Sequence, residues 1–262
     1  MNGSKLIIHD LTKSFGGLLA VDHVNITTIP RGITGIIGPN GAGKTTVFNL
    51  ISGFYKPSRG QILLDDQELT GKQPHYIASL GIGRTFQNIR LFQGMMVIDN
   101  VLTALHNKLN YNLLDSLLYL PKVKKEEKKA IENIMILLGK LDLIRYANAL
   151  AISLPYGTKR RLEMARALVM NPKILLLDEP AAGLNPSEIE DLSSSIQKIN
   201  QEFKITILLI EHRMDLVASL CEKVYVMNFG KVIACGTFNE VQGNPLVLEA
   251  YLGKGASYAQ NI

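Results

Sequence analysis

The sequence has 262 residues, of which 47% are hydrophobic and 19% charged, and its formal net charge is +5. This length suits one large domain or a domain with a subdomain, and the composition excludes wholesale disorder. No apolar run reaches the roughly 18–20 residues that cross a bilayer, and the N-terminus lacks the apolar core of a signal peptide. We therefore expect a protein that stays in the cytosol.

Neither the positive charge nor the cysteines indicate a special site. Lys and Arg are spread along the chain, and the densest cluster, at 121–130, includes two glutamates, which is typical of a solvated helix start. The charge therefore does not indicate a nucleic-acid partner. Cys221 and Cys235 have no nearby ligand cluster, so we interpret them as small core residues and not as a disulfide or a metal site.

The chain begins with short strands and returns to strands after a helical stretch. Ile- and Val-rich runs predict strands at 5–11, 20–29, 32–38 and 59–69. From about 88 to 153 the pattern becomes helical, with apolar residues at Ile131, Ile134, Leu137 and Leu138 on one helix face. Strands are expected again at 173–179, 205–212, 223–228 and 231–236, and a helix at 187–203. Continuous apolar strands separated by helices indicate a buried parallel sheet.

These elements predict two parts. An α/β core would comprise residues 1–87 and 154–262, and a helical subdomain would be inserted at 88–153. We see no internal repeat.

A phosphate-binding loop follows the strand at 32–38. Residues 38–45 match the pattern G-x-x-x-x-G-K-[ST], with a helix expected directly after them. The glycines let backbone N–H groups converge on phosphate oxygens, and the helix N-terminus adds positive potential. Lys44 is expected to reach the β- and γ-phosphates, and the Thr45 hydroxyl to ligate Mg²⁺. The candidate nucleotide-binding residues are Gly38, Pro39, Asn40, Gly41, Ala42, Gly43, Lys44, Thr45 and Thr46.

A second candidate group is the acidic pair that ends the strand "ILLLDE". Asp178 and Glu179 would lie at the carboxyl edge of the sheet, where ligands bind in this fold class. Asp178 is expected to hold Mg²⁺ through its water shell, and Glu179 to orient or deprotonate the attacking water. Such a pair often only caps a helix, but the loop at 38–45 favours the catalytic interpretation.

Two features concern the base of the nucleotide. "NKLN" at 107–110 resembles the guanine-reading pattern N-K-x-D, but it ends in Asn110 and lies in the helical region, so we interpret it as a coincidence. Phe15 precedes the phosphate loop at a distance that suits an aromatic platform for adenine. A core residue at a strand end is an equal alternative for Phe15. The sequence thus favours ATP over GTP.

The motifs together resemble those of the ATP-binding subunits of ABC transporters, over almost the whole chain. They come in the family's order: an aromatic loop (Phe15), Walker A (38–45), a Q-loop (Gln87), a signature (154–158), Walker B (174–179), a D-loop (Ala182, Gly183, Leu184 and Asn185) and a switch histidine (His212). The resemblance implies an α/β P-loop NTPase (RecA-like) core with an N-terminal antiparallel β portion and an inserted helical subdomain. It also implies ATP and Mg²⁺ as cofactors and ATP hydrolysis as the activity.

Gln87 ends a predicted strand, "GIGRTFQ", and His212 follows "ITILLIE" at the end of another. In the family, a glutamine at the position of Gln87 contacts Mg²⁺ or the attacking water at the hinge of the helical subdomain, and a histidine at the position of His212 contacts the γ-phosphate. The alternatives are an ordinary polar residue at a strand end and a structural histidine. We expect Gln87, Glu179 and His212 to be the catalytic residues, and Thr45, Gln87 and Asp178 to serve the metal.

The signature departs from the family's usual L-S-G-G-Q. Alignment on "MARAL" places Leu154, Pro155, Tyr156, Gly157 and Thr158 on those five positions. Pro155 replaces the serine that would bond the γ-phosphate, and it also lacks an N–H. The following helix still offers its N-terminal amides and dipole. The D-loop departs too, with Asn185 where the family usually has Asp.

Four short segments resemble those of the subgroup that serves branched-chain (hydrophobic) amino-acid uptake: "LPYG", "RRLEMARAL", "DEPAAGLNP" and "VLEAYLG". The nearest other subgroup serves urea and short-chain amides. The resemblance implies head-to-tail pairing with a second, usually different, ATP-binding subunit around two ATP. It also implies transmembrane permease subunits, an extracytoplasmic substrate-binding protein and a peripheral location on the cytoplasmic face of the cell membrane.

Two other functions compete with import. Soluble ABC ATPases of translation or DNA repair usually carry tandem ATPase units or a long coiled coil, and this chain has one Walker A and no sustained heptads. A non-enzymatic nucleotide-binding partner would be favoured if the altered signature made both sites inert. Lys44, Asp178, Glu179 and His212 are all intact, which argues against that function.

Overall fold

The computed structural model describes residues 3–105 and 121–252, so the "NKLN" sequence lies outside the described residues. The chain divides into two compact units, one spanning Met1–Gln87 and Pro172–Ile262, the other Asn88–Asn171. The first boundary agrees with the sequence, whereas the return to the α/β unit comes at Pro172 and not at 154. The reason is that helix α6 (Tyr156–Leu168), which contains the last three signature residues, packs on helix α3 (Val97–Leu105) of the inserted unit.

The first unit contains an antiparallel sheet built from the N-terminal strands. Its order is β2-β1-β4-β5, and the strands are β1 (Leu6–Phe15), β2 (Leu18–Thr27), β4 (Arg59–Leu64) and β5 (Gln67–Glu68). The turns between β1 and β2 and between β4 and β5 make these pairs antiparallel. The strand and turn expected at 59–69 are β4, β5 and the turn between them.

A second sheet of the same unit is almost entirely parallel. Its order is β10-β9-β3-β8-β7-β6, and only β10 runs antiparallel to its neighbour. Every residue of the three central strands is buried, which explains why they appear in the sequence as unbroken apolar runs. The strands are β3 (Ile33–Ile37), β6 (Ile82–Arg84), β7 (Ile174–Asp178), β8 (Thr206–Ile210), β9 (Lys223–Asn228) and β10 (Lys231–Gly236).

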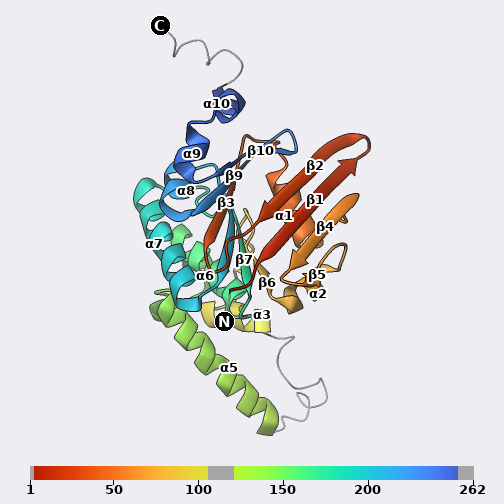
Figure 1. The fold of residues 1–262 in the computed structure, drawn as a ribbon. Coiled ribbons are helices and arrows are strands. Elements are labelled where there is room, and N and C mark those ends of the chain that lie inside the picture. Colours follow the sequence, from red (N-terminus) through yellow and green to blue (C-terminus); the bar gives the residue numbers. More distant parts are fainter. Residues whose placement is uncertain (1–2, 106–120, 253–262) are drawn as a thin grey trace. The chain divides into compact units, whose positions relative to one another are not determined.

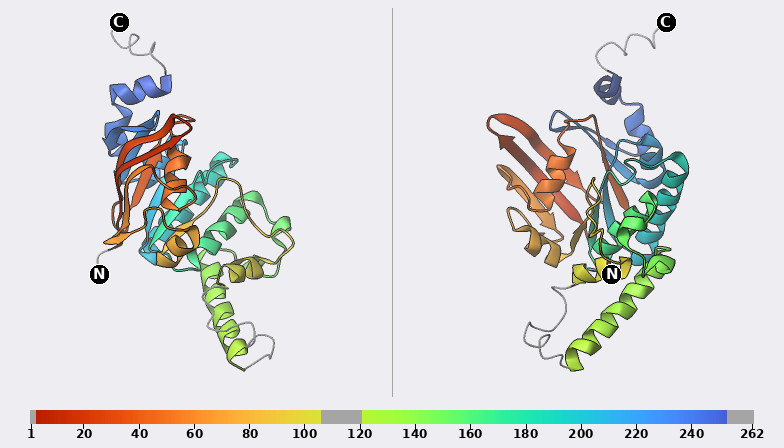
Figure 2. Two further views of the ribbon diagram at one scale, coloured as in Figure 1. Left: turned by 90° about the vertical axis from the view of Figure 1, so that its right-hand side faces the viewer. Right: turned by 180° about the vertical axis from the view of Figure 1, so that it is seen from behind.

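Helices cover both faces of this parallel sheet. Helix α1 (Lys44–Ile51) lies between the two sheets (Figures 1 and 2), and its Phe48 is fully buried in a core to which both sheets contribute. Helices α7 (Pro186–Phe203) and α8 (Met214–Leu220) lie on the opposite side in the same views. The remaining helices of the unit are α2 (Pro74–Leu80), α9 (Phe238–Gln242) and α10 (Pro245–Leu252). The predicted α/β fold, with its antiparallel portion, is confirmed.

Asn185, the unusual D-loop residue, has a clear structural task. Its side chain accepts the backbone N–H of Glu188 at 3.0 Å, and the Glu188 carboxylate accepts the N–H of Asn185 at 3.0 Å. This capping box satisfies two amides at the start of α7. An Asp at this position could form the same cap, so the Asn keeps the local structure of the D-loop.

The second unit is helical, as expected. Its elements are α3, α5 (Pro121–Lys140), η2 (Ile144–Tyr146), η3 (Ala151–Ser153) and α6. Helix α5 buries Ile134, Leu137 and Leu138, but Ile131 is 39% exposed and does not belong to the buried stripe. Among residues 3–105 and 121–252, no helix is long and apolar enough to cross a membrane.

The cysteine prediction is half wrong. Cys221 is partly buried next to the C-terminus of α8, and burial raises the pKa of its thiol to about 12. Cys235 is exposed, because it lies on β10, the edge strand of the parallel sheet, and none of its strand's residues is fully buried.

Candidate active site

The register of three parallel strands brings the candidate residues of the first unit to the same edge of the sheet. Ile36 of β3 pairs with Ile210 of β8, and Ile210 pairs with Asp178 of β7. The three strands therefore end at the same level, and the segments that follow them leave the same edge of the sheet. The Glu179 backbone N–H donates to the Ile210 carbonyl at 2.9 Å, which ties the acidic pair to the neighbouring strand end.

The loop after β3 can be built only with glycine at two positions. Gly38 and Gly43 have φ angles of 149° and 98°. A Cβ at Gly38 would lie 2.1 Å from the Met227 carbonyl oxygen, and one at Gly43 would lie 2.4 Å from the Ala20 carbonyl oxygen. Any side chain there would clash with the backbone, which accounts for both glycines of the pattern.

Lys44 is buried at the mouth of the loop. Its ammonium donates to the carbonyl oxygens of Gly38 at 2.6 Å and Pro39 at 2.9 Å. Burial lowers the pKa of Lys44, and the charges of Glu179 and Asp178 oppose that change. A desolvated cation held by backbone dipoles and facing two carboxylates is well suited to bind a polyphosphate.

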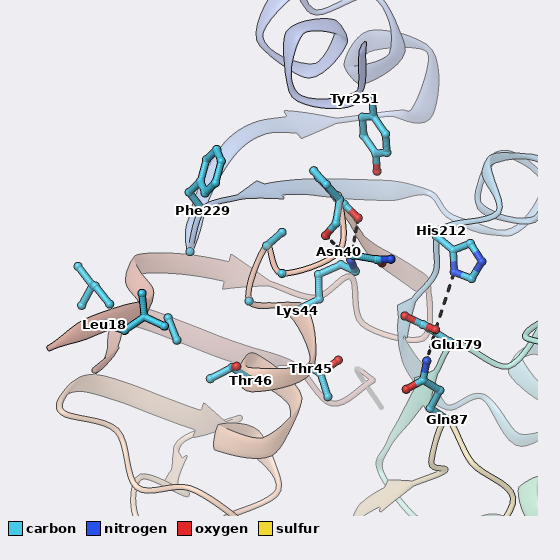
Figure 3. A pocket seen from close by; sticks show the side chains of 18 residues that line it. Leu18, Asn40, Lys44, Thr45, Thr46, Gln87, Glu179, His212, Phe229 and Tyr251 are labelled. Atoms are coloured by element: carbon cyan, nitrogen blue, oxygen red, sulfur yellow. Dashed lines mark hydrogen bonds and ion pairs between the residues drawn. The ribbon is translucent and has the colours of Figure 1, made fainter. Parts of the chain in front are cut away.

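A pocket of about 990 Å³ opens over the loop. Figure 3 shows it as an elongated site, with Leu18 and Phe229 at one end and Gln87, Glu179 and His212 at the other. All nine loop and helix residues from Gly38 to Thr46 line it, together with Leu19, Ala20, Gly230 and Tyr251. The pocket is thus apolar where a base would lie and polar where a terminal phosphate would lie.

The three predicted catalytic side chains meet at the polar end. Gln87 Nε2 donates to Glu179 Oε2 at 2.6 Å, and His212 Nδ1 lies 3.8 Å from the same oxygen. Gln87 lies three residues beyond the end of β6, and His212 two residues beyond β8, so loops and not strand ends present them. Glu179 has a left-handed backbone with φ of 47°, an uncommon state for a non-glycine residue that is enriched at active sites.

Asp178 is only 3% exposed and is not among the residues that line the pocket; it is paired with a residue that the predicted site does not include. Arg84 Nη2 lies 2.9 Å from Asp178 Oδ2, while Nη1 donates to Asn49 Oδ1 at 2.9 Å and Ser52 Oγ at 3.1 Å. Burial raises the pKa of Asp178, and the hydrogen bond and charge of Arg84 oppose the rise. The signal was present in "GRTFQ", because an Arg on an otherwise buried strand needs a carboxylate partner.

The other oxygen of Asp178 fits a magnesium site. Oδ1 is buried and accepts no hydrogen bond within the described parts of the chain. A buried carboxylate oxygen without a partner is costly, and a metal or a metal-bound water would satisfy it. Thr45 lines the adjoining pocket from the first turn of α1, so a hydroxyl and a carboxylate are both available for Mg²⁺.

Comparisons with known proteins identify the arrangement. A family model described as "ABC transporter" matches residues 21–182, which is more than half of the chain. The chain belongs to the ABC transporter family. It is therefore an ATP-binding cassette, the ATPase subunit of a transporter. A second model, described as "Branched-chain amino acid ATP-binding cassette transporter", matches residues 231–257.

Individual ABC relatives cover nearly the whole chain. The high-affinity branched-chain amino acid transport ATP-binding protein LivG of Escherichia coli is 46% identical over 254 residues, covering 97% of this chain and 100% of that protein. The corresponding protein BraF of Pseudomonas aeruginosa is 47% identical over 249 residues, covering 95% and 98%. A crystal structure of the ADP conformation of an ABC transporter cassette superposes with a TM-score of 0.83, at 34% identity over 97% of this chain and 100% of that one.

A second buried carboxylate of this ABC subunit also escaped the sequence analysis. Glu211 is fully buried between β8 and the switch histidine. Its Oε1 accepts the Ala181 N–H at 2.8 Å, and its Oε2 accepts the N–H groups of His212 and Arg213 at 3.0 and 3.3 Å. Burial raises the pKa of Glu211, and these amides oppose the rise. The carboxylate thereby links the backbone of the switch to the start of the D-loop.

Phe15 does not line the pocket. Its ring packs edge-on against Tyr55 with centroids 5.1 Å apart, and Lys13 Nζ lies 4.8 Å from its centre. Leu18 and Phe229 lie at the apolar end instead. Phe229 is 86% exposed in the turn between β9 and β10. The sequence does not indicate it as a pocket residue, because nothing in the chain order places that turn beside β2. The adenine role of Phe15 stays a prediction.

The signature residues belong to the second unit. Leu154 and Thr158 are buried, Pro155 is the N-cap of α6, and Tyr156 begins the helix and is 42% exposed. The Tyr156 hydroxyl lies 3.2 Å from an Arg160 nitrogen, and Arg160 also pairs with Glu163. Pro155 is tolerated here because the first N–H groups of a helix have no partner within the helix. The segment thus keeps a helix N-terminus despite the loss of serine.

The Arg84–Asp178 pair predicts a large stability effect. Arg84→Met should lower the free energy of unfolding by about 3–5 kcal/mol, because Asp178 would remain buried without its cation. Urea denaturation monitored by circular dichroism measures this. The matched control is Arg59→Met, which breaks an ion pair with Asp10 on a side chain that is 69% exposed and should cost about 1 kcal/mol or less. Equal effects of the two substitutions would contradict the account.

Proposed function

We propose that this chain is the ATP-hydrolysing subunit of an importer for branched-chain or other hydrophobic amino acids. The observation that carries the ATPase role is the meeting of Lys44, Glu179, Gln87 and His212 in one pocket at the edge of the parallel sheet. The substrate class is supported by the relatives named for branched-chain amino acid transport and by the match at residues 231–257.

The apolar and polar ends of the pocket support one orientation for ATP. The base would lie at the apolar end, near Leu18 and Phe229, and the triphosphate would run along the loop toward Glu179. Backbone N–H groups of the loop and the Lys44 ammonium would bind the β- and γ-phosphates. Mg²⁺, when bound, would neutralise charge on the phosphate oxygens, and Thr45, Asp178 and Gln87 are the residues that would hold it.

Glu179 is the proposed general base. Its carboxylate would accept a proton from water as the water oxygen bonds to the γ-phosphorus and the bond to the bridging oxygen breaks, leaving ADP and phosphate. The amide of Gln87 holds one carboxylate oxygen at 2.6 Å and so fixes the direction of the base. His212, close to the same oxygen, would donate to the γ-phosphate.

The partner proposals follow from the family and from the signature. Two ATP-binding subunits would close head to tail, so that residues 154–158 of one face the ATP of the other. With Pro155 in place of serine, contact with that ATP would depend on amides at the start of α6 and on Tyr156. The pair would drive two transmembrane permease subunits at the cytoplasmic face of the membrane, with substrate delivered by an extracytoplasmic binding protein.

The base assignment predicts a separation of binding from turnover. Glu179→Gln should keep ATP affinity and lower the hydrolysis rate by about a hundredfold or more, because an amide cannot take the proton. Lys44→Ala should instead lose ATP affinity, because the loop would lose its buried cation. Equilibrium ATP binding and phosphate release measure both. Rapid hydrolysis by Glu179→Gln would reject Glu179 as the base, and unchanged affinity in Lys44→Ala would reject the loop assignment.

Co-purification from native membranes tests the transport role. The tagged full-length chain should recover two permeases and a second, different ATP-binding subunit. Recovery of a homodimer with permeases would reject only the mixed pairing. Recovery with ribosomes or DNA repair factors would reject the importer and favour a soluble ABC ATPase.

A further inference from the structure

Tyr251 brings the C-terminal helix into the ATP pocket. It lies near the end of α10, more than two hundred positions along the chain from the phosphate loop, and lines the same pocket as Lys44, Glu179 and His212. Figure 3 shows its hydroxyl pointing toward the loop near Asn40. None of the ATP-binding motifs of the sequence includes this residue.

The ring of Tyr251 also borders an apolar cavity. A separate cavity of about 270 Å³ lies against α9 and α10, and Tyr251 lines it together with Ile37, Met214 and Val247. Tyr251 is thus the side chain that borders both cavities, with an apolar face toward one and a hydroxyl toward the other. An amphipathic ring at such a boundary keeps its polar tip directed into the wet site.

The hydroxyl points toward the loop that also holds the lysine. Gly38, whose carbonyl accepts from Lys44 Nζ at 2.6 Å, lines the pocket together with Tyr251. A phenol has one proton of its own, which it can donate to an acceptor in the pocket. Burial raises the pKa of Tyr251 to about 12, so the group is a neutral donor near neutral pH.

The acceptor that fits this place is the terminal phosphate. Lys44 is the loop residue that reaches the β- and γ-phosphates. Its ammonium lies at the carbonyls of Gly38 and Pro39, in the pocket that Tyr251 also lines. The attacking water would be on the same side, near Glu179 and His212. ADP would not extend to this end of the pocket.

We propose that Tyr251 is a further ATP-binding residue, whose hydroxyl donates a hydrogen bond to the γ-phosphate and so makes α10 sensitive to the presence of that phosphate. The proposal rests on the ATPase function proposed above. This hydrogen bond would give α10 a role in the nucleotide cycle, because loss of the γ-phosphate would break the contact between α10 and the nucleotide.

The test compares ATP with ADP in a variant that loses only the hydroxyl. Tyr251→Phe is made in the full chain that already carries Glu179→Gln, so that ATP is not consumed, and both affinities are measured by calorimetry with Mg²⁺. ATP affinity should fall by about tenfold or more, the loss of one hydrogen bond to a charged group, and ADP affinity should change by less than about twofold. Tyr76→Phe, a tyrosine of α2 with similar exposure that does not line the pocket, is the matched control and should change neither.

Three results would overturn the proposal. Unchanged or tighter ATP binding by Tyr251→Phe would show that the hydroxyl does not hold the phosphate. Equal losses for ATP and ADP would show that Tyr251 acts through the shape of the loop. In both cases the parent chain still binds ATP, whereas failure of the parent to bind ATP would overturn the proposed function as well.

Discussion

The shared level at which β3, β8 and β7 end is the constraint on which the whole site depends. A slip of one residue between β8 and β7 would turn Asp178 to the other face of the sheet. The observed register instead places the phosphate loop, the Asp178–Glu179 pair and the Glu211–His212 pair at one edge. Since all three strands are buried on both faces, their hydrogen bonds are shielded from water and the edge is rigid. The buried core thus fixes the edge from which the loops that present Gln87 and His212 leave the sheet.

Burying charged groups at this rigid edge costs free energy, and each of these charges has its own compensating partner. Lys44 is held by two carbonyl oxygens, Asp178 by Arg84 and Glu211 by three backbone amides. Without such partners a buried ion would neutralise itself by a shift of its pKa. The same contacts also join other elements to the ATP site. Arg84 of β6 pairs with Asp178, Lys44 of α1 bonds to the phosphate loop, and Glu211 accepts the Ala181 N–H just before the D-loop.

Much of the fold and of the candidate site could be predicted from the sequence, because both follow from local patterns with a fixed spacing. The loop at 38–45, the strand ending in Asp178 and the amphipathic helix at 121–140 each follow from a few consecutive residues. Arg84 and Asp178 are 94 positions apart and Tyr251 lies on the last described helix, so no local pattern pairs them with the site. The boundary at 154 failed for a similar reason: the signature belongs to the Walker motifs by alignment but packs with the inserted helices.

The central claim is that the loop and Asp178 form one Mg²⁺-dependent ATP site within this chain. The most direct test measures ATP affinity with and without Mg²⁺ in the Glu179→Gln chain and in the same chain with Asp178→Asn, since Asn can still accept from Arg84. We predict that Mg²⁺ strengthens ATP binding to the first by about tenfold or more and has little effect on the second, while both bind ATP equally without the metal. An equal Mg²⁺ effect in both chains would contradict the claim.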